Sequence, residues 1–207
     1  MKRLLLVLFF PTLMLAGCKK GGDTPEPTPS PSQNGVLING VIWAKCNVDA
    51  PGIFAAAPES YGMFYQWNRK TAWPSTGAIS NWDSSYPTGV NWETANDPCP
   101  AGWHVPDQAQ QATLLDVSKV AYEWTTFNGV NGGKFTDKLS GNSIFLPAAG
   151  YRSFLVGSLF TAGNYGNYWS GSSTSTYGAW FLLFYSGSAY QGSDSRPYGF
   201  TVRCIFQ

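Results

Sequence analysis

The sequence predicts an α+β fold with short antiparallel strands, one main helix and long irregular loops. Three observations support this class. Only residues 107–117 carry the signals of a helix start, and short apolar runs in the second half of the chain are separated by Gly- and Ser-rich turns. Residues 50–97 are rich in aromatic side chains and follow neither a helical nor a strand period.

The N-terminal residues read as a targeting segment. Two basic residues precede an apolar run from Leu4 to Leu15, and Leu15-Ala16-Gly17-Cys18 closes the segment. The run is too short to span a bilayer as a stable helix, so residues 1–17 are expected to be a signal peptide. Because the last four residues resemble a bacterial lipobox, we expect Cys18 to carry the lipid. The alternative is an ordinary secreted protein with an incidental cysteine.

Acyl chains on Cys18 would anchor the mature protein to a membrane, since each buried methylene contributes about 0.8 kcal/mol. Position 19 is Lys rather than Asp, which resembles the sorting pattern of outer-membrane lipoproteins. We therefore expect an outer-membrane protein that is lipid-anchored, with the membrane itself as one partner. Whether it faces the cell surface or the periplasm stays open.

A proline-rich tether is expected over residues 18–35. After Cys18 it holds four prolines that alternate with polar residues, and it has no aromatic or aliphatic side chain. Such a segment buries too little apolar area to fold, so it should be an extended spacer. A ligand for a proline-recognition domain is the weaker alternative. Residues 36–207 then form one domain.

The first elements of that domain follow from turn and cap chemistry. Asn39-Gly40 lies between two apolar runs and predicts a β-hairpin, because both residues accept a positive φ. A long irregular segment is expected over residues 50–97, followed by a helix over residues 108–117. Asp107 is its expected N-cap, and Gln110 stands where a capping box needs it.

Short strands are expected in the second half of the chain. In the run 180–185 every residue is apolar or aromatic, so a central strand covered on both faces is predicted. In the run 199–206 apolar residues alternate with Thr201, Arg203 and Ile205, which predicts a half-buried strand. Two further short runs, 145–146 and 168–170, complete the set.

Charge and composition exclude several partners. Only 12% of the 207 residues are charged, 16% are aromatic, and the formal net charge is +1. A nucleic-acid-binding protein would need a basic surface, so no nucleic acid is expected as a partner.

The cysteines indicate one disulfide. With Cys18 lipidated, three cysteines remain, and an odd number leaves one unpaired in an oxidising compartment. We favour a bridge between Cys99 and Cys204, with Cys46 a free and buried small hydrophobe. A bridge between Cys46 and Cys99 stays open.

Five ordered motifs resemble those of a known family. They are Trp43-Ala44-Lys45-Cys46-Asn47-Val48, the run 97–106 (DPCPAGWHVP), the run 145–152 (FLPAAGYR), the run 168–173 (YWSGSS) and the run 199–204 (GFTVRC). Together they resemble the Fibrobacter succinogenes major paralogous domain (FISUMP) family, found on bacterial surface lipoproteins. The resemblance covers residues 36–207.

The resemblance implies a C-type lectin-like fold, in which Cys99 and Cys204 form the recurring bridge. Position 46 need not be cysteine in relatives, which fits a free Cys46. In this sequence the motif residues read mainly as fold-making, because Trp and Pro-Gly turns usually serve packing.

Catalysis is not expected. His104 is the only histidine, so zinc or triad chemistry has little support, and a structural role beside the helix is the better interpretation. Glu93 and Asp97 could be a carboxylate pair, but only their distance in space could tell. The sugar-binding loop of calcium-dependent lectins is missing, so neither a metal nor a cofactor is implied.

Ligand binding without a metal is therefore the predicted function, with glycans as the favoured ligand. Aromatic rings stack on sugars, and neighbouring polar groups donate and accept hydrogen bonds. The ligand-binding candidates are Trp73, Trp82, Tyr86 and Trp92. These rings could instead pack the loops onto the core. The alternative function is a structural or adhesive component that binds another surface protein.

Overall fold

The structure is a computed structural model that describes residues 31–207. In this range the strands form four small sheets, and all paired neighbours run antiparallel. In order across each sheet, these are β1 (Gly35–Ile38), β2 (Val41–Ala44), β14 (Ile205–Phe206) and β4 (Trp103–His104); β5 (Val120–Phe127), β6 (Val130–Asp137) and β7 (Ser143–Pro147); β3 (Tyr65–Gln66), β13 (Gly199–Phe200), β8 (Tyr151–Arg152) and β9 (Leu159–Phe160); and β10 (Gly166–Ser173), β11 (Gly178–Tyr185) and β12 (Ser188–Ser195).

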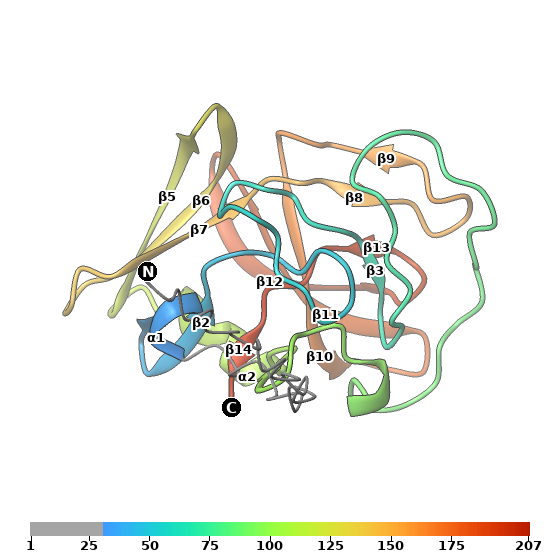
Figure 1. Ribbon diagram of the computed structural model, residues 1–207, viewed down its shortest axis with the longest axis horizontal. Coiled ribbons are helices and arrows are strands. Elements are labelled where there is room, and N and C mark those ends of the chain that lie inside the picture. The colour runs from blue at the N-terminus through green and yellow to red at the C-terminus, as the bar shows by residue number, and fades with distance from the viewer. Residues whose placement is uncertain (1–30) are drawn as a thin grey trace, which may run out of the picture.

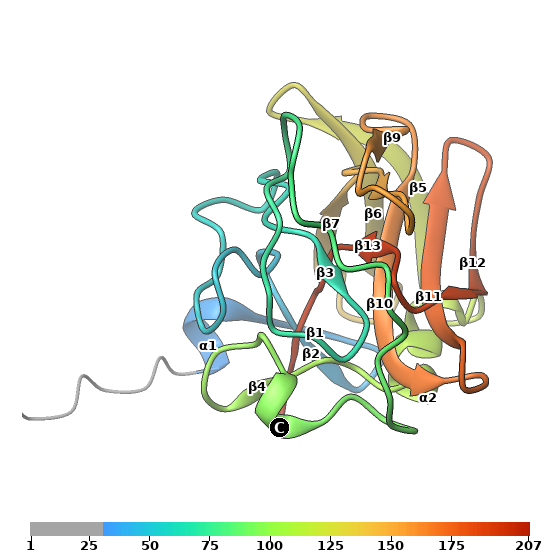
Figure 2. The same ribbon diagram turned by 90° about the vertical axis from the view of Figure 1, so that its right-hand side faces the viewer.

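Helices are short in the described part of the chain. They are α1 (Pro31–Asn34), the 3-10 turn η1 (Thr94–Asn96), α2 (Gln108–Ala112) and the 3-10 turn η2 (Thr113–Leu115). In Figure 1 the sheet of β5 to β7 stands at the upper left, and β8 and β9 lie at the upper right. Figure 2 shows β10, β11 and β12 side by side at the right-hand side.

The predicted α+β, C-type lectin-like fold is wrong, because the fold is mostly β. The expected main helix over residues 108–117 ends as α2 after five residues. At its C-cap, the Thr113 hydroxyl donates to the carbonyl oxygen of Gln110 at 2.7 Å, and a 3-10 turn follows. Asp116 then takes an extended conformation, and the chain enters β5. No described helix is long enough to cover a sheet.

The local start signals of that helix are confirmed. The Asp107 side chain accepts a hydrogen bond from the Gln110 backbone N–H at 2.7 Å, and the Gln110 side chain accepts one from the Asp107 N–H at 2.8 Å. This is the predicted capping box. Local chemistry thus sets where the helix begins, although it does not set its length.

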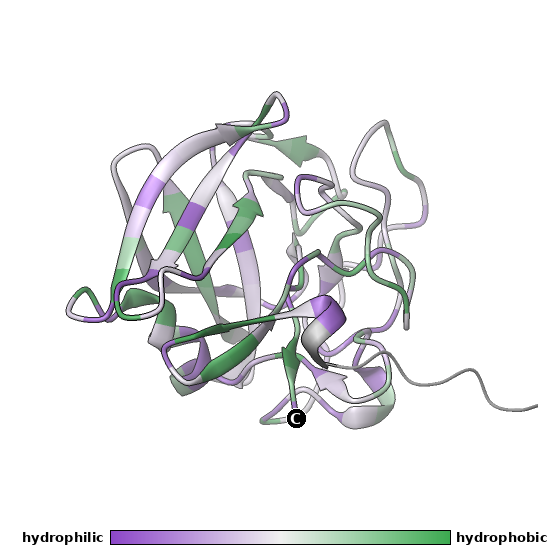
Figure 3. Cartoon of the chain, turned by 60° about the vertical axis from the view of Figure 1, so that its left-hand side comes forward, coloured by the Kyte–Doolittle hydropathy of each residue, from purple (hydrophilic) through white to green (hydrophobic). Residues whose placement is uncertain are grey.

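The first hairpin is also confirmed. β1 and β2 pair antiparallel around Asn39 and Gly40, whose φ angles are 44° and 81°. In Figure 3 the strands of this hairpin are largely hydrophobic, whereas the adjoining α1 is more hydrophilic. Trp43 and Ala44 are buried, so the hairpin contributes to the core.

A second long hairpin, β5 with β6, was not expected. Its turn is Asn128-Gly129, with φ angles of 47° and 81°, which is the same dipeptide chemistry as in the first hairpin. Its strands carry glycine, threonine and charged residues, so the apolar alternation that normally identifies strands is weak.

The strand expected over 180–185 is confirmed as part of β11, the central strand between β10 and β12. By contrast, the run 199–206 is not one half-buried strand. It divides into β13 and β14, which belong to different sheets, and Thr201, Arg203 and Ile205 are all buried. Both faces of this run are therefore covered.

Three buried arginines hold this architecture together, and each binds backbone carbonyl groups. Arg152 donates to Pro74, Thr76, Gly77 and Gly157, Arg196 to Pro87, Ser175 and Gly178, and Arg203 to Ala44, Lys45 and Phe145. Burial lowers the pKa of all three guanidinium groups. Arg152 and Arg196 thereby supply hydrogen-bond donors mainly to loop carbonyl oxygens, whereas Arg203 links β2 to β7.

The predicted disulfide is confirmed: Cys99 is bonded to Cys204, and of the described cysteines Cys46 is free and partly buried. The bridge joins the 97–106 motif to the C-terminal run. Asp97 shapes that motif, because its carboxylate accepts hydrogen bonds from the backbone N–H groups of Cys99 at 2.8 Å and Val105 at 3.0 Å.

The buried apolar residues form three clusters. One joins β2, β6 and β11 through Trp43, Phe135 and Phe184, and a second surrounds the disulfide. The third contains Trp169, Phe181 and Phe200 and borders the cavity described below.

The predicted signal peptide, the lipidated Cys18 and the tether up to residue 30 lie outside the described residues. The last residues of the expected tether, Pro31–Asn34, form the helical turn α1 rather than an extended segment. Within residues 31–207, no helix has the length and apolar character needed to cross a membrane.

Candidate functional site

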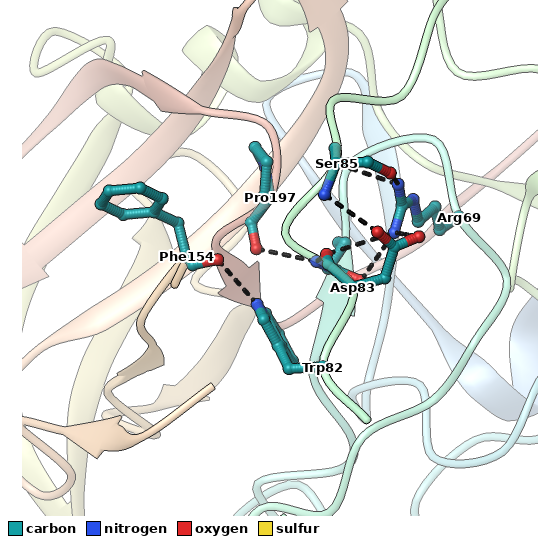
Figure 4. A network of polar contacts seen from close by, with 7 residues as sticks. Arg69, Trp82, Asp83, Ser85, Phe154 and Pro197 are labelled. Carbon is teal, nitrogen blue, oxygen red and sulfur yellow. Dashed lines mark hydrogen bonds and ion pairs between the residues drawn. The ribbon is translucent and has the colours of Figure 1, made fainter. Parts of the chain in front are cut away.

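Trp82, one of the four predicted ligand contacts, fills a slot made by two glycines. A Cβ added to Gly157 would lie 2.6 Å from the Trp82 ring, and one added to Gly199 would lie 2.8 Å from it. The indole Nε1 donates to the Phe154 carbonyl oxygen at 2.9 Å (Figure 4). Trp82 therefore fixes the irregular segment, residues 50–97, against the rest of the domain.

Polar contacts near Trp82 also fix the irregular segment in place (Figure 4). Arg69 forms an ion pair with Asp83 and donates to the Ser85 carbonyl oxygen at 3.0 Å. Gln66 donates to the carbonyl oxygen of Pro197 at 3.0 Å. The part of the irregular segment around Trp82 is therefore held against the segment just before β13.

Of the four predicted contacts, the structure brings Trp73 and Trp82 together, while Trp92 and Tyr86 each pair with a different ring. Trp73 packs on Trp82 with ring centroids 4.9 Å apart. Trp92 donates to the Asn96 carbonyl oxygen at 2.9 Å and packs against Trp67. Tyr86 is 41% exposed and packs edge-on against Tyr177. The structure does not gather these four rings into one binding surface.

We expect Trp82→Ala to lower the free energy of unfolding by about 3 kcal/mol, because it empties the slot between the two glycines. Tyr86→Ala, which removes an exposed ring from the same segment, should cost less than about 1 kcal/mol. Urea denaturation of both variants measures the difference. Equal losses of unfolding free energy in the two variants would contradict this role of Trp82.

A different set of residues forms a cavity of about 340 Å³, here called the aromatic cleft. Five of its nine lining residues are Tyr or Phe, and they come from β8, β11, β13 and the adjoining turns. The lining residues are Tyr151, Thr161, Tyr165, Asn167, Phe181, Leu183, Asp194, Tyr198 and Phe200.

One wall of the aromatic cleft depends on a close approach at Gly150. A Cβ at this position would lie 2.1 Å from the Phe160 carbonyl oxygen and 2.6 Å from the Ala162 nitrogen, so only glycine lets the turn after β9 pack here. In that turn Thr161 has a φ of 54°, a left-handed conformation that costs a β-branched residue about 1–2 kcal/mol. Strain of this kind concentrates at functional sites.

Four of the aromatic rings that line the cleft pack against one another. Tyr198 stacks on Phe200 with centroids 5.7 Å apart, and Phe181 lies 4.7 Å from Phe200. Tyr151 meets Tyr198 edge-on at 5.6 Å. Because these side chains are held by neighbours, the cleft is preformed.

Asp194 supplies the one carboxylate among the lining residues. One of its oxygens accepts a hydrogen bond from the Ser195 N–H at 2.7 Å. Burial raises the pKa of Asp194, and this hydrogen bond only partly opposes the effect. Neither ion pair found in residues 31–207 includes this group, since these join Arg69 to Asp83 and Lys119 to Asp116.

We expect Asp194→Asn to stabilise the folded domain at pH 7. A raised pKa means that the folded state binds the proton more tightly than the unfolded state, so the free energy of unfolding falls as pH rises through this range. Asn cannot ionise, and its oxygen can still accept from Ser195. Urea midpoints should be similar for parent and variant at pH 3 and higher for the variant at pH 7. A lower midpoint for the variant at pH 7 would contradict this account.

The candidate catalytic groups are engaged in structure. Asp97 binds backbone N–H groups of its motif, and Glu93 accepts from the Asn96 side chain at 3.3 Å. The His104 backbone pairs with Ile205, while its imidazole Nδ1 is buried and has no hydrogen-bond partner among residues 31–207. No cluster of three or more His, Cys, Asp or Glu residues that could hold a metal occurs in residues 31–207.

Two motifs interpreted as fold-making carry cleft residues. Tyr151 belongs to the 145–152 motif and Phe200 to the 199–204 motif, with Asp194 and Tyr198 just before the latter. The signal in the sequence that could have identified these residues is Asp194, four positions before the run Tyr198-Gly199-Phe200. Nothing in the sequence spacing indicates that it meets Tyr151.

A family model described as a domain of unknown function, DUF8237, matches residues 99–205. No curated protein and no solved structure matches the chain. All nine residues of the aromatic cleft lie inside the matched range, whereas the four predicted contacts lie before it. Because the match covers half of its length, the chain belongs to the DUF8237 family.

Proposed function

We propose that residues 36–207 form a non-catalytic, calcium-independent ligand-binding domain whose aromatic cleft binds glycans. The observation that carries the proposal is the joint presence in one cavity of fixed aromatic rings and the side chains of Asn167, Thr161 and Asp194. Ring faces pack against the C–H faces of sugars, while amide, hydroxyl and carboxylate groups bind sugar hydroxyls. A volume of about 340 Å³ suits one short stretch of a glycan.

The composition of the cleft supports binding rather than hydrolysis. Hydrolysis of a glycosidic bond uses a pair of carboxyl groups on either side of the bond. Asp194 is the only carboxylate lining the cleft, and no histidine lines it. The chemistry therefore favours recognition without turnover.

A glycan array tests this function with a matched pair of tyrosine variants. Tyr165 is 38% exposed and lines the cleft, whereas Tyr190 is 44% exposed and does not line it. Tyr165→Ala should weaken glycan binding by about tenfold or more, because it removes a ring that stacks on the sugar. Tyr190→Ala should bind glycans as tightly as the parent does. Absence of any glycan ligand for the parent, or equal losses in both variants, would remove the proposal.

We also propose that the chain is a lipid-anchored outer-membrane protein related to the FISUMP lipoproteins that its motifs resemble. The support is the order of basic residues, apolar run and Leu15-Ala16-Gly17-Cys18. Labelling with a lipid precursor tests the anchor. The parent should be labelled and Cys18→Ala should not, and an unlabelled parent would exclude the anchor.

A further inference from the structure

We infer that the aromatic cleft selects sugars that carry a free, protonated amine, and that Asp194 is the residue that recognises the amine. This inference rests on the proposed glycan-binding function and names the class of glycan.

The cleft offers an anionic oxygen without a cationic neighbour. The Ser195 backbone N–H donates a hydrogen bond to one carboxylate oxygen of Asp194. Neither ion pair among residues 31–207 includes the other oxygen. The nearest arginine in sequence, Arg196, points its guanidinium at the carbonyls of Pro87 and Ser175 and lies 4.2 Å from the Trp67 ring. A partly desolvated carboxylate of this kind gains most from a ligand that brings its own positive charge.

Asn167 adds an acceptor to the same cavity. This buried side chain donates its amide N–H to the Gly150 carbonyl oxygen at 3.2 Å. This contact uses one amide N–H of Asn167. No hydrogen bond within residues 31–207 uses Asn167 Oδ1, so this oxygen is free to accept one from a ligand. Asp194 and Asn167 therefore present two acceptors to the cavity, and an ammonium group brings three donors.

The rings around these acceptors also favour a cation. The faces of Tyr and Phe attract ammonium groups, and the attraction grows where water is excluded. Tyr151, Tyr198 and Phe200 contact one another beside Asp194, and burial raises the pKa of Tyr198 with Asp194 among its neighbours. A neutral N-acetyl or hydroxyl group would gain neither the charge-assisted hydrogen bond nor this attraction.

The carboxylate at this position works against folding, because burial disfavours its charged form. Asparagine would keep the contact with the Ser195 N–H and avoid that cost. A residue that lowers stability is typical of a functional site, where activity and stability are in conflict.

The experiment uses two oligosaccharides of equal length and linkage, one of glucosamine and one of N-acetylglucosamine, so that they differ only in the free amine. Affinities are measured by calorimetry for the parent, for Asp194→Asn, and for Glu123→Gln, which removes an exposed carboxylate on β5. The parent and Glu123→Gln should bind the glucosamine oligomer at least about tenfold more tightly than the acetylated one, and Asp194→Asn should lose this preference.

The pH dependence gives a second readout. Binding of the glucosamine oligomer by the parent should weaken as pH falls through the raised pKa of Asp194, because the carboxylate becomes neutral. The other titratable side chains that line the cleft with Asp194 are Tyr151, Tyr165 and Tyr198, with Tyr86 near Tyr198, and burial raises the pKa of Tyr198 above its ordinary value. Asp194→Asn should show no such acid limb.

The outcomes separate this inference from the function on which it rests. Equal binding of both oligomers by the parent, or a preference that survives in Asp194→Asn, would overturn amine recognition and leave glycan binding intact. Binding of neither oligomer, together with an array that shows no ligand, would overturn both.

Discussion

Arg203→Met is expected to lower the free energy of unfolding by about 3 kcal/mol or more. The Arg203 guanidinium donates to Asn47 Oδ1 at 2.8 Å and to the carbonyl oxygens of Ala44 at 2.9 Å, Lys45 at 2.7 Å and Phe145 at 3.0 Å. A buried acceptor left without a partner costs about 1–3 kcal/mol, and relief from burying a charge offsets part of the total.

The matched control is Arg69→Met. Arg69 also donates to carbonyl oxygens, but its ion-pair partner Asp83 is half exposed, so solvent replaces the lost contacts and the expected loss is about 1 kcal/mol. Urea unfolding of the two variants measures the difference. Equal losses would show that the buried carbonyl groups do not depend on Arg203.

Loss of the Cys99–Cys204 disulfide has the second large expected effect. The bridge closes a loop with a sequence separation of 105 residues, and the chain-entropy model gives about 4–5 kcal/mol for a loop of this length. The Cys99→Ala/Cys204→Ala double variant should therefore unfold at a much lower urea concentration than the parent.

Cys46→Ala is the control for the disulfide variant, since it removes a free and partly buried thiol. It should lower the free energy of unfolding by about 1 kcal/mol, the size of a small packing defect. A reducing agent should destabilise the parent and leave the double variant unchanged. A parent insensitive to reduction would contradict the assigned role of the bridge.

Features that depend on local chemistry could be predicted from the sequence. Asn39-Gly40 specifies its hairpin because both residues accept positive φ, and Asp107 with Gln110 specifies the helix start because their partners lie three residues away. The hairpin at Asn128-Gly129 carries the same information, but the strand that follows the turn, β6, lacks the apolar alternation.

Features that depend on distant partners could not be predicted in this way. Arg203 alternates with apolar residues and so reads as solvent-facing, yet its partners come from segments near residues 45 and 145. The predicted α+β class is wrong for a related reason. Periodicity and caps favoured a helix to residue 117, whereas the chain turns at Thr113 and pairs its next residues as β5 and β6.

The candidate site shows the same limit. The sequence favours aromatic residues of the irregular segment as ligand contacts, because loops often carry function. In the structure, the indole N–H groups of Trp82 and Trp92 donate to carbonyl oxygens. The nine residues of the aromatic cleft lie on five strands and the turns beside them, and of these only Tyr151 and Phe200 belong to the motifs. Composition points to aromatic residues in general, but only the fold shows which of them share a cavity.

An amide and indole N–H spectrum recorded during titration with the glucosamine oligomer tests the central claim most directly. The Ser195 N–H donates to the Asp194 carboxylate, and Trp82 and Trp92 carry indole N–H groups outside the cleft. The account predicts that the Ser195 signal shifts with saturation and that both indole signals stay in place. Shifts of the indole signals with an unmoved Ser195 signal would place the ligand on the irregular segment and contradict the account.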